Sequence, residues 1–138
     1  MLLGQGLAAA ATPAQYAAPY HPKMAYAEQA SPARARLPLP RIRGQITDRA
    51  GNAVPQVELG LYTDAAPHKL LALALSDDHG KFDFGGAIPS GNYRLIAMYP
   101  GLCTANVPLE LNRNARRRSL ALRMEYPGLD VCSHATLK

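Results

Sequence analysis

The sequence predicts an all-β protein, a seven-stranded antiparallel β-sandwich, on three observations. Residues 76–95, SDDHGKFDFGGAIPSGNYRL, read as strand, tight turn, strand, wider turn and strand. Within this stretch Phe82 and Phe84 alternate with polar residues, which is the period-two pattern of a half-buried strand. From Arg41 onward, turn-forming residues recur about every eight to twelve positions, as they do in β-sandwiches. The sequence lacks the period of about 3.6 residues that marks an amphipathic helix.

The two turns in this stretch have residues suited to reversing the chain. Asp77 and Asp78 have acceptor side chains for the backbone amides ahead of them, and Gly80 supplies the positive φ that a hairpin turn requires. Residues 89–91, Pro-Ser-Gly, form the second and wider turn. The stretch therefore predicts a sheet that is pinned by two turns.

The other strands follow in order, and each alternates aliphatic residues with polar or small ones. In the first strand Ile42 and Ile46 share the inward face. The third strand, residues 70–76, is nearly continuously apolar, which indicates that both of its faces are covered. The seven predicted strands span residues 41–48, 57–63, 70–76, 81–84, 93–99, 103–111 and 116–124.

The composition divides the chain into three parts. Residues 1–40 contain half of the chain's 12 prolines, and each proline disfavours a helix. We therefore expect an extended, flexible Ala/Pro-rich arm, in which Leu37 and Leu39 are the residues that would contact the domain. Residues 41–126 form the β-sandwich domain, and residues 127–138 form a C-terminal tail.

The extreme N-terminus, MLLGQGLAAAATPAQ, is a short apolar run that ends in small residues. It is similar to the later part of a secretory signal peptide, although the positively charged start is missing. Together with the two cysteines, this run favours export to the periplasm, the cell surface or the medium. The sequence has no run of about 18 apolar residues, so it predicts no transmembrane segment.

The net charge of +5 is shared between the arm and the domain. A basic excess can favour nucleic acid, but dedicated nucleic-acid binders concentrate the charge on one face and often add stacking aromatic residues. The sequence therefore predicts no nucleic-acid partner.

Two segments carry a family resemblance, namely RIRGQITDRAGNAVPQVELGLYT and SDDHGKFDFGGAIPSGNYRL. Together they resemble the carboxypeptidase regulatory-like domain over residues 41 to about 124. The resemblance implies a transthyretin-like (prealbumin-type) Greek-key β-sandwich, and a non-catalytic, usually exported accessory module of larger surface proteins. The matching positions are Gly44, Ile46, Asp48, Gly51, Pro55 (one residue late), Val57, Asp77, Gly80, Phe82, Phe84, Pro89, Gly91 and Tyr93.

The two cysteines, Cys103 and Cys132, each follow a Tyr-Pro-Gly bend. In an exported protein we expect them to pair and to tie the tail to the domain. The chain-entropy model gives such a disulfide roughly 3 to 4 kcal/mol of stabilisation. The alternative is two free thiols, one of them on a frayed tail.

The sequence predicts no metal and no cofactor. Cys132 and His134 would need two further zinc ligands that no local spacing provides. Asp77, Asp78 and Asp83 lack the further oxygen ligands of a calcium loop, and a turn explains the first two.

The sequence also predicts no enzymatic activity. The four histidines, His21, His68, His79 and His134, show no nucleophile arrangement with a nearby Ser or Cys. The transthyretin-like fold has one enzymatic branch, 5-hydroxyisourate hydrolase, whose C-terminus resembles Tyr-Arg-Gly-Ser. This chain ends in SHATLK instead, so a hydrolase is the third and weakest functional interpretation.

The predicted function is therefore a structural or protein-binding role, as a monomer or weak oligomer, through a strand edge or the loops at one end of the sandwich. A basic cluster is one candidate patch for an acidic partner, or else it protects a turn and an edge strand from unwanted pairing. A carbohydrate- or cell-envelope-binding module is the second interpretation, and it requires exposed aromatic residues. The basic cluster comprises Arg113, Arg116, Arg117 and Arg118. The aromatic candidates are Tyr62, Tyr93, Tyr99 and Tyr126, of which Tyr93 is expected in the core.

Overall fold

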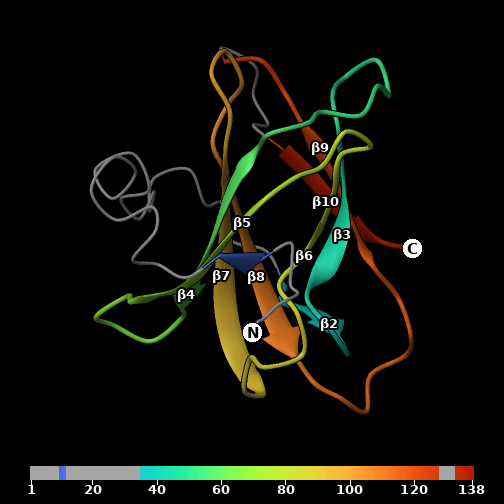
Figure 1. The fold of residues 1–138 in the computed structure, drawn as a ribbon. Coiled ribbons are helices and arrows are strands. Elements are labelled where there is room, and N and C mark those ends of the chain that lie inside the picture. Colours follow the sequence, from blue (N-terminus) through green and yellow to red (C-terminus); the bar gives the residue numbers. More distant parts are fainter. Residues whose placement is uncertain (1–9, 12–34, 128–132) are drawn as a thin grey trace.

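The computed structural model describes residues 10–11, 35–127 and 133–138 as two β-sheets that enclose one core (Figure 1). One sheet has six strands in the order β1-β5-β4-β7-β8-β2, and the other has four in the order β10-β9-β3-β6. The strands are β1 (Ala10–Ala11), β2 (Leu37–Leu39), β3 (Arg43–Thr47), β4 (Glu58–Thr63), β5 (Leu70–Leu75), β6 (Lys81–Asp83), β7 (Gly91–Met98), β8 (Ala105–Leu111), β9 (Leu120–Met124) and β10 (Ser133–Leu137). The described part of the chain contains no helix that is long and apolar enough to cross a membrane.

The predicted all-β sandwich is confirmed, and each of the seven predicted strands is present as β3 to β9. One feature of the prediction is wrong, because the sheets are mixed rather than antiparallel. The pairs β2–β8 and β3–β9 are parallel. Alternation along a strand determines which residues face the core, but it contains no information about the direction of the neighbouring strand.

Three described strands were not predicted, and each is short or weakly patterned. β2 has the sequence LPL, yet Leu39 is fully buried in the core and Leu37 packs against it. β10 has only two apolar residues that pack on the core, Ala135 and Leu137. Only the pairing with a neighbour identifies these two segments as strands. β2 pairs with β8 at one sheet edge, and β10 pairs with β9 at an edge of the other sheet.

The division of the chain at residue 41 stays a prediction.

The core is aliphatic, as the composition indicates. The inward faces of β3, β4 and β7 contribute fully buried side chains, such as Ile46, Leu61 and Leu95. Phe82 and Phe84 complete the core in an edge-to-face contact with ring centroids 6.2 Å apart. The predicted cover on both faces of β5 is only partial on the outward face. The alanines of β5 face the core, and Leu73 belongs to a second apolar cluster with Tyr62 and Ile96, but Leu71 is exposed.

The hairpin turn before β6 has the predicted chemistry. Asp77 Oδ1 accepts hydrogen bonds from the backbone N–H groups of His79 (2.8 Å) and Lys81 (2.9 Å), and Gly80 has φ = 73°. The hydrogen bond from the Lys81 backbone is the main reason that the pKa of Asp77 lies below its ordinary value. Of the two predicted aspartates, Asp77 is the one that makes these bonds.

The close approach of β3 and β9 depends on a glycine. Gly44 pairs with Leu120 in the parallel ladder, and a Cβ atom at Gly44 would lie 2.1 Å from the Leu120 carbonyl oxygen. No side-chain rotamer relieves a clash between a Cβ atom and a backbone oxygen. A side chain at this position therefore forces the two strands apart.

We expect Gly44→Ala to lower the free energy of unfolding by about 3 kcal/mol, because the strands must separate to admit the methyl group. Urea unfolding followed by circular dichroism measures this change. Gly86→Ala is the matched control, since its added Cβ meets only Arg41 Nη1 at 3.9 Å, an ordinary contact. Equal stability of the two variants would contradict the close approach.

A pair of arginines holds the loop between β4 and β5 through Asp64. Arg94, on β7, donates from Nε to Asp64 Oδ1 at 3.0 Å, and Arg36, just before β2, donates to Oδ2. Burial acts to raise the pKa of Asp64, but the hydrogen bonds and charges of Arg36 and Arg94 outweigh it, so the pKa lies below its ordinary value. The carboxylate therefore ties the start of the described domain to the six-stranded sheet.

We expect Asp64→Asn to lower the free energy of unfolding by about 1.5 kcal/mol at pH 7, because charge-assisted hydrogen bonds are lost. The pKa of Asp64 is lower in the folded than in the unfolded state. The ionised carboxylate therefore contributes to the free energy of unfolding when the pH is above the unfolded pKa of about 3.9, and this contribution disappears as the pH falls below that value. Urea unfolding over a pH series should show the wild type and the variant converging in acid. A difference that persists undiminished in acid would contradict the ionic role.

Candidate functional site

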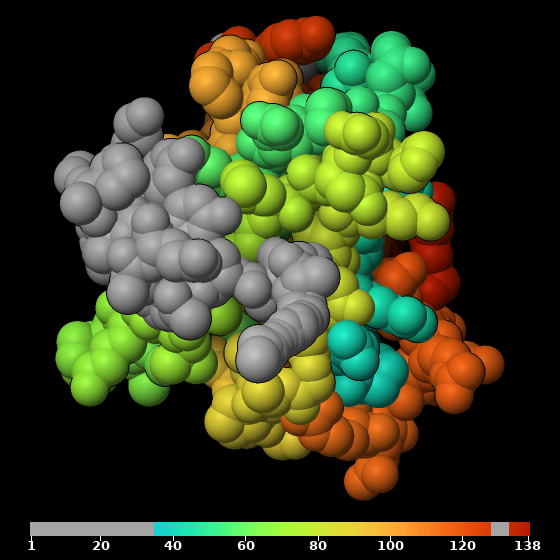
Figure 2. All heavy atoms as spheres, viewed as in Figure 1, coloured from blue at the N-terminus to red at the C-terminus, as the bar shows by residue number. Residues whose placement is uncertain are grey.

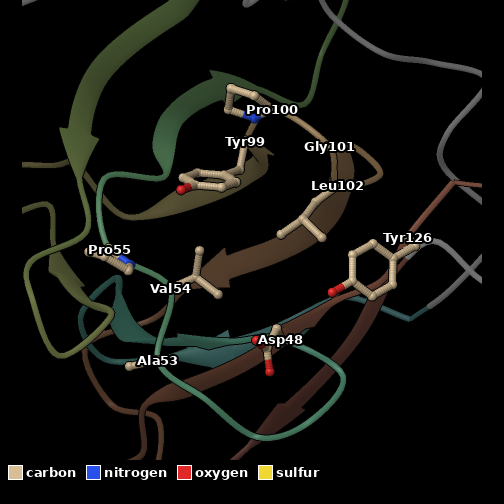
Figure 3. A pocket seen from close by; sticks show the side chains of 9 residues that line it. All are labelled: Asp48, Ala53, Val54, Pro55, Tyr99, Pro100, Gly101, Leu102 and Tyr126. Carbon is tan, nitrogen blue, oxygen red and sulfur yellow. The ribbon is translucent and has the colours of Figure 1, made fainter.

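One end of the sandwich has a cavity of about 290 Å³, hereafter the loop-end cavity (Figure 3). Three loops surround it: the connection from β3 to β4, the turn from β7 to β8, and the chain that leaves β9. These loops lie together at the upper end of the molecule in Figure 1. The lining residues are Asp48, Ala53, Val54, Pro55, Tyr99, Pro100, Gly101, Leu102 and Tyr126.

Hydrogen bonds within the first loop fix its part of the lining. Asp48 Oδ1 accepts from the backbone N–H groups of Ala50 and Asn52, both at 2.9 Å. The Val54 N–H donates to the Ile46 carbonyl at 3.1 Å, which anchors the far side of the loop to β3. Side-chain bonds of this kind are typical of Asx turns. The cavity wall is therefore held by β3 itself.

The turn between β7 and β8 forms the opposite wall. The Leu102 N–H donates to the Tyr99 carbonyl at 3.1 Å, and Gly101 has φ = 86°, a conformation that favours glycine. This turn places the Leu102 and Tyr99 side chains toward the cavity, where Figure 3 shows them between Pro55 and Tyr126. The sequence identified a break at Pro100 and Gly101 but not that the break lines a cavity.

The cavity is lined by apolar and polar surface in similar amounts. Val54, Pro55 and Leu102 supply the apolar surface, and Tyr126 stands at the rim with 54% of its surface exposed. Both backbone N–H groups that bond to the Asp48 side chain donate to Oδ1. The other oxygen, Oδ2, accepts no hydrogen bond from the described part of the chain. Such a cavity suits an apolar group that carries a hydrogen-bond donor.

The structure separates the four tyrosines that were predicted as aromatic candidates. Tyr62 and Tyr93 are buried, and burial is the main cause that raises the pKa of each phenol. The Tyr93 hydroxyl donates to the Pro89 carbonyl and so holds the turn before β7. Tyr99 and Tyr126 are the two that come together, and both line the loop-end cavity.

A second group of polar side chains, hereafter the Glu125 cluster, comprises Arg123, Glu125 and His134. Arg123 Nε donates to Glu125 Oε2 at 2.9 Å, and His134 Nε2 lies 3.3 Å from the same oxygen. The Glu125 side chain is only 4% exposed, whereas those of Arg123 and His134 are 45% and 46% exposed. The other carboxylate oxygen, Oε1, is buried and has no hydrogen-bond partner in the part of the chain that the structure describes.

No sequence pattern predicts the Glu125 cluster. The last predicted strand ends one residue before Glu125, and the predicted tail, not a strand, contains His134. In the structure His134 pairs directly with Arg123 between β10 and β9. The one usable signal is the alternation of β9. If it is continued by two residues, Glu125 falls on the same face as Arg123.

The predicted basic cluster lies at the opposite end of the molecule, in the connection from β8 to β9. Arg113 donates to the carbonyls of Gly86 and Ile88, at 3.2 and 2.5 Å, so it holds a neighbouring loop. Arg116 and Arg117 are exposed and Arg118 is half-buried, in the segment that projects at the lower edge of Figure 2 (orange). Partner binding by this segment stays a prediction.

The predicted disulfide involves one described cysteine. The Cys103 N–H donates to the Glu125 carbonyl at 2.8 Å, so Cys103 lies beside the end of β9. Cys132 lies outside the described residues, and its pairing with Cys103 stays a prediction. Within the described residues, no group of three or more His, Cys, Asp or Glu side chains is placed to hold a metal ion.

No family model and no curated protein matches this sequence. Solved structures do match. 5-Hydroxyisourate hydrolase of Klebsiella pneumoniae is 14% identical, with a TM-score of 0.53 over 77% of this chain and 99% of that chain. Transthyretin of Sparus aurata is 14% identical, with a TM-score of 0.50 over 71% and 97%. (S)-allantoin synthase is 12% identical, with a TM-score of 0.53, and its match covers 75% of this chain and 44% of that one.

These similarities show that the chain has the transthyretin-like fold. They also correct the expectation that the chain is not an enzyme. Two of the structural neighbours are enzymes, a hydrolase and a synthase, so this fold does not argue against catalysis. At 12 to 14% identity the likeness concerns the fold alone, and activity has to be argued from the side chains of this chain.

Proposed function

We propose that this protein is a binding module that recognises a segment of another protein through the loop-end cavity. The observation that carries the proposal is the joint placement of Tyr99, Tyr126 and Asp48 around one cavity that has both apolar and polar surface. Tyrosines at the rim of an apolar cavity are frequent anchors of protein–protein recognition, because they bury a large ring and keep a polar tip.

The chemistry of the cavity indicates the kind of segment that fits. A volume of about 290 Å³ suits one or two side chains, and the walls at Val54 and Leu102 favour apolar ones. Asp48 Oδ2 has no hydrogen bond from the described residues, so it can accept one from a lysine or arginine of the partner. We expect a peptide with an apolar or aromatic residue close to a basic one.

The proposal includes the finer assignments of the sequence analysis: a carboxypeptidase regulatory-like module that is exported and carries a Cys103–Cys132 disulfide. The geometry around Glu125 supports the disulfide. Cys103 bonds to the Glu125 backbone, and Ser133, the residue after Cys132, pairs with Met124, the residue before Glu125. A bond between the cysteines would fasten the wall of the cavity next to Tyr126.

A carbohydrate or another component of the cell envelope is the second candidate partner. The observation that favours it is again the pair Tyr99 and Tyr126, because aromatic rings beside a carboxylate can stack on a sugar and bond its hydroxyl groups. A glycan array with the wild type and Tyr126→Ala distinguishes the candidates. A glycan signal that depends on Tyr126 favours this partner over a peptide.

The protein-binding proposal is tested by selecting a phage library of random peptides on the wild-type protein. We expect the enriched peptides to lose affinity about tenfold or more on Tyr126→Ala, because the variant removes the rim of the cavity. Tyr126 is more than half exposed, so the variant should fold as the wild type does.

Leu71→Ala is the matched control. Leu71 is the other large exposed hydrophobic residue among those described, and it does not line the cavity. The enriched peptides should bind Leu71→Ala as they bind the wild type. Peptides that bind Tyr126→Ala unchanged, or a selection that enriches nothing, would show that the loop-end cavity is not a peptide site.

A further inference from the structure

We propose that the Glu125 cluster is a hydrolytic site, in which His134 is the general base and Glu125 positions it, for small acyl compounds such as activated esters. The proposal is independent of the loop-end cavity, because it uses Arg123, Glu125 and His134, and none of these lines the cavity. It concerns reaction chemistry on the outer face of the four-stranded sheet.

The Glu125 carboxylate is buried. Glu125 is 4% exposed, and its Oε1 has no hydrogen-bond partner among the described residues. A buried polar atom without a hydrogen-bond partner lowers the stability of the fold, so a structural role alone explains such a residue poorly. A carboxylate that has to hold an imidazole in place explains why this position is not apolar.

The imidazole of His134 is oriented by the carboxylate and accessible to solvent. Glu125 Oε2 lies 3.3 Å from His134 Nε2, so a proton on Nε2 points to the carboxylate and leaves Nδ1 as the basic nitrogen. His134 is 46% exposed, which gives a substrate access to it. In sites that activate a nucleophile, another side chain commonly orients the general base. The hydrogen bonds of such a base are often long before the substrate binds.

The guanidinium group of Arg123 lies beside the imidazole of His134. Arg123 and His134 are direct partners in the β9–β10 ladder, so their side chains stand on the same face about 5 Å apart at Cβ. Arg123, on β9, and Glu125, directly after β9, are the charged groups beside β10 on this face. The register places Arg43, Lys81 and Asp83 on the same face farther across β3 and β6.

The reaction follows from these positions. His134 Nδ1 takes a proton from a water molecule while the water oxygen bonds to the acyl carbon, and the carbonyl electron pair moves to its oxygen beside Arg123. The intermediate collapses, the bond from the acyl carbon to the leaving oxygen breaks, and His134 returns its proton to the leaving group. Water and ester give acid and alcohol, with no other reactant.

The test uses hydrolysis of p-nitrophenyl acetate by the purified full chain, measured as the rate constant above buffer. We expect His134→Gln to lower this constant about tenfold or more, since general bases contribute factors of about 100 to 10,000 in enzymes. His79→Gln is the matched control, because His79 is an exposed histidine of the turn before β6. It should leave the rate unchanged.

Two further variants separate chemistry from folding. Added imidazole should restore the rate of His134→Gly, which a merely structural defect would not permit. Glu125→Gln should lower the rate while the downfield proton resonance of the His134 Nε2–H disappears, which identifies Glu125 as a positioning residue. The proposal is overturned if His134→Gln hydrolyses the ester like the wild type, if His79→Gln loses as much activity, or if the wild type is no faster than free imidazole at equal concentration.

Discussion

The close parallel approach of β3 and β9 at Gly44 is the constraint on which both candidate sites depend. Because the two strands run in the same direction, their C-terminal ends emerge at the same end of the sandwich. β3 ends next to Asp48, and β9 ends next to Glu125 and Tyr126. The pairing thus brings together residues that are more than seventy positions apart in sequence. An antiparallel pairing, as first expected, would have placed Asp48 and Tyr126 at opposite ends.

The sequence was sufficient for the faces and turns of the fold, because these depend on local patterns. Alternation identified inward residues such as Ile46 and Leu61, and Asp77 with Gly80 identified the hairpin. Strand direction was not predictable, since alternation is the same for both directions. β10 was missed for a related reason: five residues with two apolar side chains become a strand only when β9 offers an edge with free backbone groups.

The candidate sites were less predictable than the fold, because each joins residues from separate elements. The alternation of its strand already places Tyr93 in the core, and its burial agrees. Only the fold shows that Tyr62 is also buried and that Tyr99 and Tyr126 line one cavity. Glu125 had no local signal beyond its alternation with Arg123. The structural neighbours include a hydrolase and transthyretin, so the fold by itself does not choose between catalysis and binding. In this chain, binding is proposed for the loop-end cavity and catalysis for the Glu125 cluster. These are different surfaces at the same end of the sandwich.

Solution NMR of the isotope-labelled protein tests the parallel pairing most directly, through proton–proton contacts between β3 and β9. The account predicts cross-strand contacts in the register that pairs Gln45 with Ala121 and Ile46 with Leu122, in parallel order. Contacts that run in the opposite order along the two strands, or strands that make no such contacts, would contradict it.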